Sequence, residues 1–418
     1  MHKIIINGGK RLNGQINISG AKNSAVALIP GAILCDETIT LYNVPDISDV
    51  DSLEEMLINL NTKIDRKPNG EVFIDSKNIV NIPIKKELSK KLRASYYFMG
   101  ALLGKFKHVE MCFPGGCSIG ARPIDIHLKG FKALGATIVE EDDNFIIDAE
   151  NLKGTNIYLD FPSVGATINL IYAAVKAKGV TVIENAAKEP EIVNVATYLN
   201  AMGAKITGAG TSKIRIKGVN YLHSCVHEVI PDRIEAGTYE IIAAAVGDDV
   251  KINNIIPEHL ESLNQKLKEM NVNINVNDDN VIITKSENIK SCDIVTEIYP
   301  GFPTDLQQVL ASLMAVSKGT SSIKETIWEN RFLNLYEIEK MGAKINIIDD
   351  TAFINGVSEL RACEINATDL RAGAGLIVAG LLANGITVIN NADYILRGYA
   401  NIVEKLTNIG AEIKLIEE

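Results

Sequence analysis

The segment from residue 113 to 127, FPGGCSIGARPIDIH, places the thiol of Cys117 among glycines and shortly before Arg122. Glycine permits unusual backbone dihedral angles, so we expect a mobile loop here. A nearby cation lowers the pKa of a thiol, and an exposed thiol can donate a proton or act as a nucleophile. Cys117 is therefore a candidate catalytic residue, and a merely exposed cysteine is the alternative that the residues leave open.

Basic and small polar residues recur where apolar helices are expected to begin. A helix N-terminus attracts anions, whereas a lysine or arginine there is locally unfavourable. Each arginine could pair with a nearby Asp or Glu, but the repetition favours a shared anionic ligand. These residues are Lys22 and Asn23, Arg93, Ser163, Asp232 and Arg233, Asp305, and Asp369 and Arg371.

The elements that would position these residues repeat along the chain. Segments such as AMGAKI, ending at Ile206, and KMGAKI, ending at Ile345, recur roughly every 70 residues, which indicates internal duplication. In each copy an amphipathic helix stops near a glycine and enters an Ile/Val strand. An upstream helix is apolar on nearly all sides, which predicts burial. Six copies of this α/β unit predict two domains of three copies each.

Composition excludes several classes of protein. The 418 residues are 46% hydrophobic and 22% charged, with a net charge of -10, which disfavours nucleic-acid binding. No apolar run is long enough to span a bilayer and no signal peptide is evident, so we expect a cytoplasmic protein without membrane insertion.

The six scattered cysteines are typical of reduced thiols. His223 and His227 have helical metal-ligand spacing, but their surroundings alternate like a strand, so we expect no metal site.

Several motifs together carry a family resemblance. SGAKN, LRAS, PGGCSIGARPIDIHL, PSVGAT, PDRIEAGT, YPGFPTD, DLRAGA and RGY follow one another from Ile5 onward at family spacing. In this set the chain resembles the UDP-N-acetylglucosamine 1-carboxyvinyltransferases, which are enolpyruvyl transferases. The resemblance implies two inside-out α/β domains, with residues 22–230 carrying the Cys117 loop. Residues 1–21 and 231–418 would form the second domain, with a two-strand hinge near 20–22 and 229–232.

The resemblance also implies a reaction. The enolpyruvyl group of phosphoenolpyruvate would be transferred to the 3-hydroxyl of UDP-N-acetylglucosamine through a tetrahedral intermediate, with release of phosphate. This is the first committed step of peptidoglycan precursor synthesis, and it serves the cell wall, cell shape and cell division. No cofactor and no metal would be required. A basic cleft in an acidic protein would suit two polyanionic substrates.

Site residues follow from the resemblance position by position. Cys117 would donate a proton to C3 and could form a covalent adduct with phosphoenolpyruvate, and Asp305 would be the base near the sugar hydroxyl. Lys22 and Arg397 would share in catalysis, and Arg233 would lie at the hinge. The phosphoenolpyruvate contacts would be Lys22, Asn23, Arg122 and Arg397. The UDP-sugar contacts would be Arg93, Arg122, Pro123, Ile124, Asp125, Ile126, Phe161, Pro162, Ser163, Val164, Asp305 and Ile327. Supporting residues would be Arg331, Asp369 and Arg371.

Two departures and two alternatives accompany this interpretation. LRAGAG stands where the family more often has LRASAS, and Phe161 and Pro162 replace a basic and a β-branched residue, which would alter diphosphate contacts. Retention of Cys117 predicts inactivation by the epoxide fosfomycin.

The sister enzyme 5-enolpyruvylshikimate-3-phosphate synthase lacks the PGGCSIGARP loop, and competition by shikimate-3-phosphate would reveal it. A non-catalytic UDP-sugar-binding paralogue would have no need for both an acid and a base.

Overall fold

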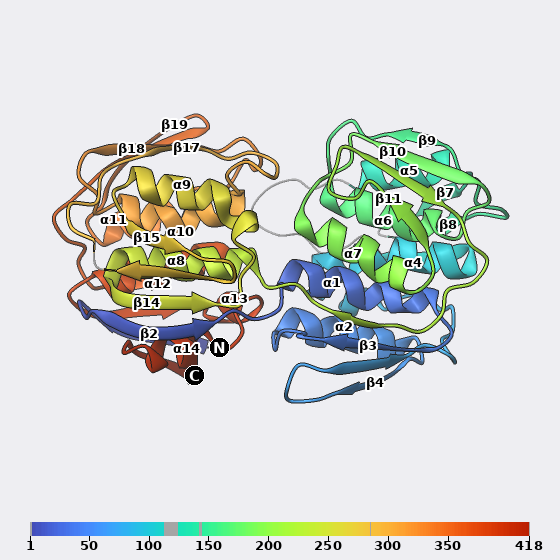
Figure 1. Cartoon of the computed structure of the whole chain (residues 1–418), viewed down its shortest axis with the longest axis horizontal. Coiled ribbons are helices and arrows are strands. Elements are labelled where there is room, and N and C mark those ends of the chain that lie inside the picture. The colour runs from blue at the N-terminus through green and yellow to red at the C-terminus, as the bar shows by residue number, and fades with distance from the viewer. Residues whose placement is uncertain (1, 113–123, 142–143, 285, 418) are drawn as a thin grey trace. The chain divides into compact units, whose positions relative to one another are not determined.

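The computed structural model describes residues 2–112, 124–141, 144–284 and 286–417 (Figure 1). The described residues form two compact units. Unit 1 contains the chain up to Ser19 and the chain from Pro231 onward, and unit 2 contains the described residues between Gly20 and Ile230. The hinge predicted near these boundaries stays a prediction.

Strands of unit 2 form sheets with a shared pattern. In the order β13-β3-β5-β4 the first pair is parallel and the next two pairs are antiparallel, and the sheet β9-β10-β12-β11 repeats this pattern. A further sheet has the order β6-β8-β7. The strands are β3 (Thr38–Tyr42), β4 (Lys63–Arg66), β5 (Val72–Asp75), β6 (His108–Cys112), β7 (Thr137–Glu141), β8 (Asn144–Asp148), β9 (Asn156–Tyr158), β10 (Val180–Glu184), β11 (Lys205–Thr207), β12 (Lys213–Lys217) and β13 (Val226–Glu228).

Unit 1 uses the same pattern three times. Its sheets run β2-β14-β16-β15, β17-β18-β20-β19 and β21-β22-β1-β23, each with one parallel pair and two antiparallel pairs. The strands are β1 (His2–Gly8), β2 (Leu12–Asn17), β14 (Gly247–Asn253), β15 (Asn273–Val276), β16 (Asn280–Thr284), β17 (Asp293–Val295), β18 (Thr320–Lys324), β19 (Lys344–Ile348), β20 (Thr351–Asn355), β21 (Glu364–Asn366), β22 (Gly385–Asn390) and β23 (Glu412–Glu417).

Helices lie inside each unit and sheets lie on its outside (Figure 1). Unit 2 has α1 (Lys22–Gly31), α2 (Ser48–Asn59), α3 (Lys86–Lys91), α4 (Tyr97–Phe106), α5 (Asp125–Ala133), α6 (Val164–Ala174) and α7 (Pro190–Ala201), with 3₁₀ turns η1 (Ala32–Leu34) and η2 (Arg93–Tyr96). Unit 1 has α8 (Arg233–Val246), α9 (Glu261–Glu269), α10 (Thr304–Met314), α11 (Leu333–Lys340), α12 (Leu370–Leu382), α13 (Asp393–Leu396) and α14 (Ile402–Asn408), with the 3₁₀ turn η3 (Pro257–Leu260).

The predicted apolar helices form the centre of each unit. In α4 every residue from Tyr97 to Gly104 is buried, and in α12 every residue from Arg371 to Leu381 is buried. Burial of each large aliphatic or aromatic side chain contributes roughly 1.5–3 kcal/mol, so helices that are apolar all round are stable only inside a core. The prediction of buried helices within repeated α/β units is therefore confirmed.

Glycines let two pairs of these helices approach closely. A Cβ atom on Gly100 of α4 would lie 2.3 Å from the carbonyl oxygen of Asn169 in α6. In unit 1, a Cβ atom on Gly375 of α12 would lie 2.4 Å from the carbonyl oxygen of Gln308 in α10. These separations leave no room for a side chain, so the second glycine of LRAGAG fits the packing of this chain.

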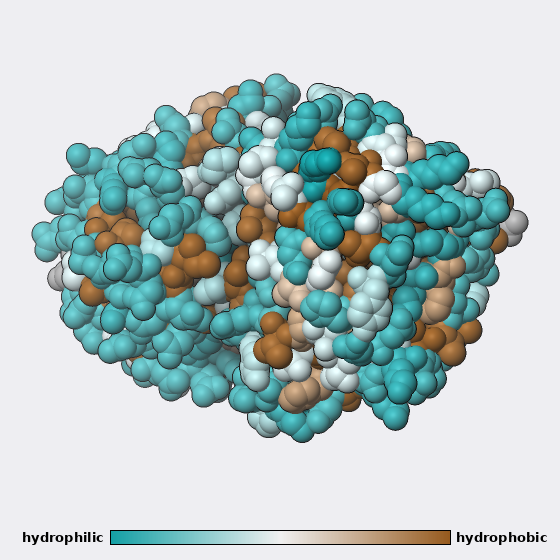
Figure 2. All heavy atoms as spheres, turned by 45° about the vertical axis from the view of Figure 1, so that its right-hand side comes forward, coloured by the Kyte–Doolittle hydropathy of each residue, from teal (hydrophilic) through white to brown (hydrophobic). Residues whose placement is uncertain are grey.

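Hydrophilic side chains cover most of the face shown in Figure 2, and hydrophobic ones form small separate patches. This pattern is usual for a protein surface, where apolar atoms remain partly exposed. Among the described residues, none of the helices combines the length and the apolar character needed to cross a membrane.

Candidate functional site

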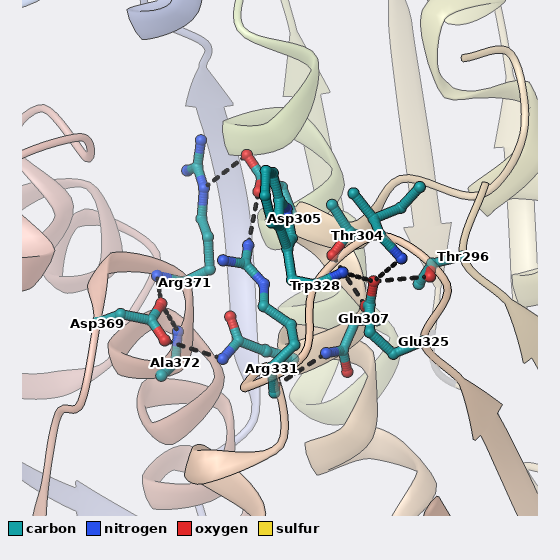
Figure 3. Close-up of polar contacts among 12 residues, drawn as sticks. Thr296, Thr304, Asp305, Gln307, Glu325, Trp328, Arg331, Asp369, Arg371 and Ala372 are labelled. Carbon is teal, nitrogen blue, oxygen red and sulfur yellow. Dashed lines mark hydrogen bonds and ion pairs between the residues drawn. The ribbon is translucent and has the colours of Figure 1, made fainter. Parts of the chain in front are cut away.

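Asp305 lies in the first turn of α10 and is the centre of an ionic cluster in unit 1 (Figure 3). The Nη2 atom of Arg331 lies 2.6 Å from Asp305 Oδ1, and the Nε atom of Arg371 lies 3.3 Å from Oδ2. Both arginine side chains are almost fully buried, whereas that of Asp305 is 29% exposed. Two cations beside the carboxylate favour its charged form, which is the form that can accept a proton.

Asp369 anchors Arg371 at the start of α12. Its side chain caps the helix by accepting from the backbone N–H groups of Arg371 and Ala372, at 2.9 and 3.0 Å. Its other oxygen accepts from the amide of Gln308, at 3.0 Å. A helix cap of this kind fixes the first turn, so Asp369 holds the backbone from which Arg371 reaches Asp305.

Two buried guanidinium nitrogens complete this cluster. Neither Arg331 Nε nor Arg371 Nη1 has a hydrogen-bond partner among the described residues. Burial alone would lower the pKa of Arg371, but nearby Tyr399 and Asp305 raise it above its ordinary value. The side chain therefore stays charged, and its unused N–H group can donate to an oxygen of a bound anion.

Glu325 holds the segment that contains Ile327. Its buried carboxylate accepts from the backbone N–H groups of Ile327 and Trp328, at 2.8 and 3.1 Å. It also accepts from the hydroxyl groups of Thr296 and Thr304, both at 2.9 Å (Figure 3). Because Thr304 precedes Asp305 directly, Glu325 ties the Ile327 segment to the start of α10.

In unit 2, Lys22 forms an ion pair at the start of α1. Its Nζ atom lies 2.6 Å from Asp49 Oδ2 in the first turn of α2, and both side chains are largely buried. A lysine at a helix N-terminus opposes the helix dipole, and the Asp49 carboxylate offsets that cost. Asn23 is the next residue of α1 and is half-buried.

Arg93 begins the 3₁₀ turn η2 before α4 and lies near a buried histidine. Burial lowers the pKa of His127 in α5 to about 3, with a further contribution from the Arg93 charge. The Asn169 amide donates to His127 Nδ1 at 3.0 Å, so the neutral ring carries its proton on Nε2. His127 is therefore an uncharged neighbour of Asp125 and Ile126 at the start of α5.

The segment Phe161–Val164 enters α6 through a capping serine. Ser163 Oγ accepts from the backbone N–H of Ala166 at 3.3 Å. Phe161 is 46% exposed, whereas Pro162, Ser163 and Val164 are half-buried. The cap fixes where the segment turns into the helix, and its exposed aromatic ring stands where the resemblance expected a basic residue.

The structure describes most, but not all, of the predicted site residues. Cys117, Arg122 and Pro123 lie outside the described residues. Arg397 follows α13 in unit 1 and is half-buried, and Arg233 lies 5.4 Å from the ring of Tyr299. Asp305, Arg331, Asp369 and Arg371 come together in unit 1, whereas Lys22, Asn23, Arg93, Ile124, Asp125, Ile126 and Phe161–Val164 belong to unit 2.

Sequence reasoning missed Asp49, His127, Gln308 and Glu325 as parts of the site. For Asp49 and Glu325 the available signal was the expectation that a buried charge needs an opposite charge or hydrogen-bond donors nearby. His223 and His227 take separate partners, the carbonyl of Ser224 and the amide of Asn194. In the described part of the chain, His, Cys, Asp and Glu side chains form no group of three or more suited to a metal ion.

Comparisons with known proteins identify the family of the chain. The sequence model of the family described as EPSP synthase (3-phosphoshikimate 1-carboxyvinyltransferase) matches residues 6–406. UDP-N-acetylglucosamine 1-carboxyvinyltransferase 2 of Lactococcus lactis subsp. lactis (strain IL1403) is 52% identical over 421 residues, covering 100% of both chains. The protein of the same name from Listeria monocytogenes serovar 1/2a (strain ATCC BAA-679 / EGD-e) is 52% identical over 411 residues, covering 98% of this chain and 97% of its own.

Solved structures share the fold. The enolpyruvyl transferase NikO from Streptomyces tendae has a TM-score of 0.90 at 24% identity, covering 99% of each chain. EPSP synthase from Acinetobacter baumannii has a TM-score of 0.76 at 18% identity, covering 100% of each. With relatives half identical over the full length, the chain belongs to the UDP-N-acetylglucosamine 1-carboxyvinyltransferases, enzymes of the enolpyruvyl transferase fold.

Proposed function

We propose that this protein transfers the enolpyruvyl group of phosphoenolpyruvate to the 3-hydroxyl of UDP-N-acetylglucosamine and releases phosphate. The observation that carries the proposal is the Asp305 carboxylate held between Arg331 and Arg371 at the start of α10. A carboxylate fixed in its charged form can accept the hydroxyl proton, and the neighbouring cations suit substrates that carry phosphate groups.

The reaction divides into an addition and an elimination. In the addition, Asp305 accepts the proton of the sugar hydroxyl, the oxygen forms a bond to C2 of phosphoenolpyruvate, and Cys117 delivers a proton to C3. In the elimination, the Cys117 thiolate takes a proton back from C3, the double bond re-forms, the bond from C2 to the phosphate oxygen breaks, and the leaving phosphate takes up the proton held by Asp305. Lys22, Arg122 and Arg397 would stabilise the phosphate and carboxylate charges throughout.

The local structure around Lys22 and the UDP-sugar segments supports the roles proposed for them. Lys22 is held by Asp49, so its amine has a defined position from which it can bind a substrate anion. Asn23 follows Lys22 in α1, and the capped Phe161–Val164 segment and the start of α5 would contact the UDP-sugar. A cytoplasmic location goes with this proposal, since both substrates are phosphorylated metabolites.

Phosphate release from phosphoenolpyruvate tests the proposal when UDP-N-acetylglucosamine is the acceptor. We expect release by the wild type, loss in Cys117→Ala, and normal release in Cys363→Ala, a control thiol that is half-buried in unit 1. Release with shikimate-3-phosphate instead of the UDP-sugar would indicate the sister reaction. UDP-sugar binding without any phosphate release would contradict the proposed activity.

A further inference from the structure

Three residues on one face of α8 hold the segment that carries Arg397. We call residues 393–408, which include α13 and α14, the Arg397 segment. The hydroxyl groups of Thr238 and Tyr399 lie 2.8 Å apart, and the amine of Lys405 lies 2.6 Å from Glu235 Oε1. The same amine lies 6.0 Å from the centre of the Tyr239 ring. Positions 235, 238 and 239 share one face of α8. This face contacts Tyr399, which precedes α14 in the chain, and Lys405, which lies within α14.

These contacts are buried. The side chain of Glu235 is 2% exposed and that of Lys405 is 16% exposed, and Tyr399 is buried with Thr238. Burying an ion pair costs desolvation energy that its attraction only partly returns, so an apolar pair of similar size would stabilise the fold as well. Stability alone therefore does not account for this pair, whereas its directional hydrogen bonds fix the position of α14.

Tyr399 also connects the Arg397 segment to the Asp305 cluster. The guanidinium carbon of Arg371 lies 5.2 Å from the centre of the Tyr399 ring, within the range of a cation–π interaction. The Nε atom of the same arginine lies 3.3 Å from Asp305 Oδ2. One side chain, Arg371, is thus in contact both with the candidate base and with a residue two positions after Arg397.

Ser19, the last residue of the N-terminal part of unit 1, contacts both Glu235 and Lys405. Its backbone N–H donates to Glu235 Oε2 at 2.8 Å, and its hydroxyl lies 2.6 Å from the amine of Lys405. Its carbonyl accepts from the backbone N–H of Asp232 at 2.9 Å. The Glu235 and Lys405 pair therefore fixes Ser19, α8 and α14 together.

We propose that Glu235, Thr238, Tyr399 and Lys405 are positioning residues, which set the place of Arg397 relative to Asp305. The inference rests on the proposed function, in which Arg397 binds phosphoenolpyruvate and Asp305 acts on the sugar hydroxyl. Since a reacting group that is misplaced by one ångström can cost about 100-fold in rate, this anchoring sets the efficiency of the phosphoenolpyruvate step.

Kinetics of the full-length Lys405→Met and Tyr399→Phe variants test the inference. Lys405→Met removes the charge and hydrogen bonds but keeps an apolar chain, and Tyr399→Phe removes only the hydroxyl. We expect Lys405→Met to lower kcat/KM for phosphoenolpyruvate about tenfold or more, with a smaller loss in Tyr399→Phe. Binding of UDP-N-acetylglucosamine alone should change less than about twofold, because only the Arg397 side is loosened. Lys405→Arg should recover part of the loss.

Matched controls separate positioning from a general effect. Lys340→Met removes an exposed lysine that pairs with Glu337 in α11, and Tyr394→Phe removes an exposed hydroxyl from α13 itself. Neither should change the phosphoenolpyruvate kinetics. Equal effects of Lys340→Met and Lys405→Met, or an unchanged KM and kcat in a folded Lys405→Met protein, would overturn the inference.

Amide hydrogen exchange gives a readout that does not need turnover. We expect the amides of residues 396–401 to exchange faster in Lys405→Met than in the wild type, with the amides of α10 unchanged. Unchanged exchange at 396–401 would overturn the anchoring. If the wild type releases no phosphate, the proposed function fails, and the exchange experiment still decides whether α8 anchors this segment.

Discussion

The starts of the central helices carry an aspartate in unit 1 but not in unit 2. In unit 1, α8 and α12 are capped by Asp232 and Asp369, and α10 carries Asp305 in its first turn. In unit 2, α1 begins at Lys22, the turn before α4 begins at Arg93, and α6 is capped by the neutral Ser163. Carboxylates suit the positive end of a helix dipole, whereas cations there are unfavourable without compensation.

One repeated architecture thus surrounds its helix starts with two different arrangements of charge. In unit 1, carboxylates occupy the helix starts, with Arg233 and Arg371 directly inside the caps of α8 and α12, and Arg331 and Arg371 bring positive charge to Asp305. In unit 2, the helix starts keep cations, and Lys22 is balanced by an aspartate from α2. In the proposed reaction, the first arrangement would hold the base in place, and the second would place helix amides and cations beside an anionic substrate.

The largest effect should come from breaking the unit 1 cluster with Asp305→Ala. This change leaves two nearly buried guanidinium groups without the carboxylate they share, which costs about 3–5 kcal/mol. Loss of the proposed base should also reduce the rate of phosphate release by about 1,000-fold. Thermal unfolding and phosphate release measure the two effects. An active and equally stable Asp305→Ala protein would remove this cluster from the account.

The two units also differ in how a buried polar side chain of a central helix is satisfied, as Asn169 in α6 and Glu240 in α8 show. Asn169 of unit 2 is fully engaged, because its carbonyl accepts from Gly100 and its amide donates to His127. Both oxygens of Glu240 are buried without a partner among the described residues, and burial raises the pKa of Glu240 to about 8 from an ordinary value of 4.5. The folded protein therefore keeps this proton where the unfolded chain releases it.

The stability that depends on this proton is fully present below about pH 4.5 and is lost as the pH rises through 8, a total of about 5 kcal/mol. We expect Glu240→Gln to raise the melting temperature at pH 8 and to change it little at pH 4.5. The exposed Glu359→Gln variant is the control. Parallel pH profiles of the wild type and Glu240→Gln would contradict the predicted titration.

Lys22 and Asp49 test the balance in unit 2. Lys22→Met leaves the buried Asp49 carboxylate without its amine partner and should cost about 3 kcal/mol of unfolding free energy. The Lys22→Met/Asp49→Leu double variant should recover most of that stability without recovering phosphate release. Calorimetry and the activity assay separate the two outcomes, and recovered turnover in the double variant would show that the amine has no part in binding phosphoenolpyruvate.

The smallest effect should come from Gly375→Ser, which restores the residue more usual in the family. Its Cβ atom would lie 2.4 Å from the carbonyl oxygen of Gln308, so α10 and α12 must separate. Overpacking of this kind costs about 1–3 kcal/mol. The neighbouring Gln308 amide also holds Asp369, so activity should fall with stability. A Gly375→Ser protein that melts at the wild-type temperature would contradict this packing argument.

Local rules were enough to predict the repeated α/β unit, whereas the inside-out arrangement of helices and sheets was implied only by the family resemblance. Each amphipathic helix is followed, two residues after its last helical residue, by a residue with positive φ: Gly135, Gly203, Gly342 and Gly410 have φ between 96° and 101°, and Asn61 and Asn271 take the same role with φ of 66°. Glycine and asparagine tolerate this backbone region best, so the helix ends can be read from the residues alone.

The ionic partners could not be predicted in the same way. Asp305 pairs with Arg331 and Arg371, which are 26 and 66 residues further along the chain. Lys22 pairs with Asp49 rather than with Asp46 or Asp51 of the same acidic stretch, because only the packing of α2 on α1 decides which carboxylate comes close. Helix starts are local properties, whereas the choice of partner depends on tertiary packing.

The decisive measurement on this protein is the mass of its nucleotide-sugar product. After incubation of the protein with phosphoenolpyruvate and UDP-N-acetylglucosamine, we expect a product heavier than the UDP-sugar by one enolpyruvyl group, with an equal amount of phosphate. Asp305→Ala should yield almost none of it. Unmodified UDP-sugar after prolonged incubation with folded protein that binds it would contradict the account.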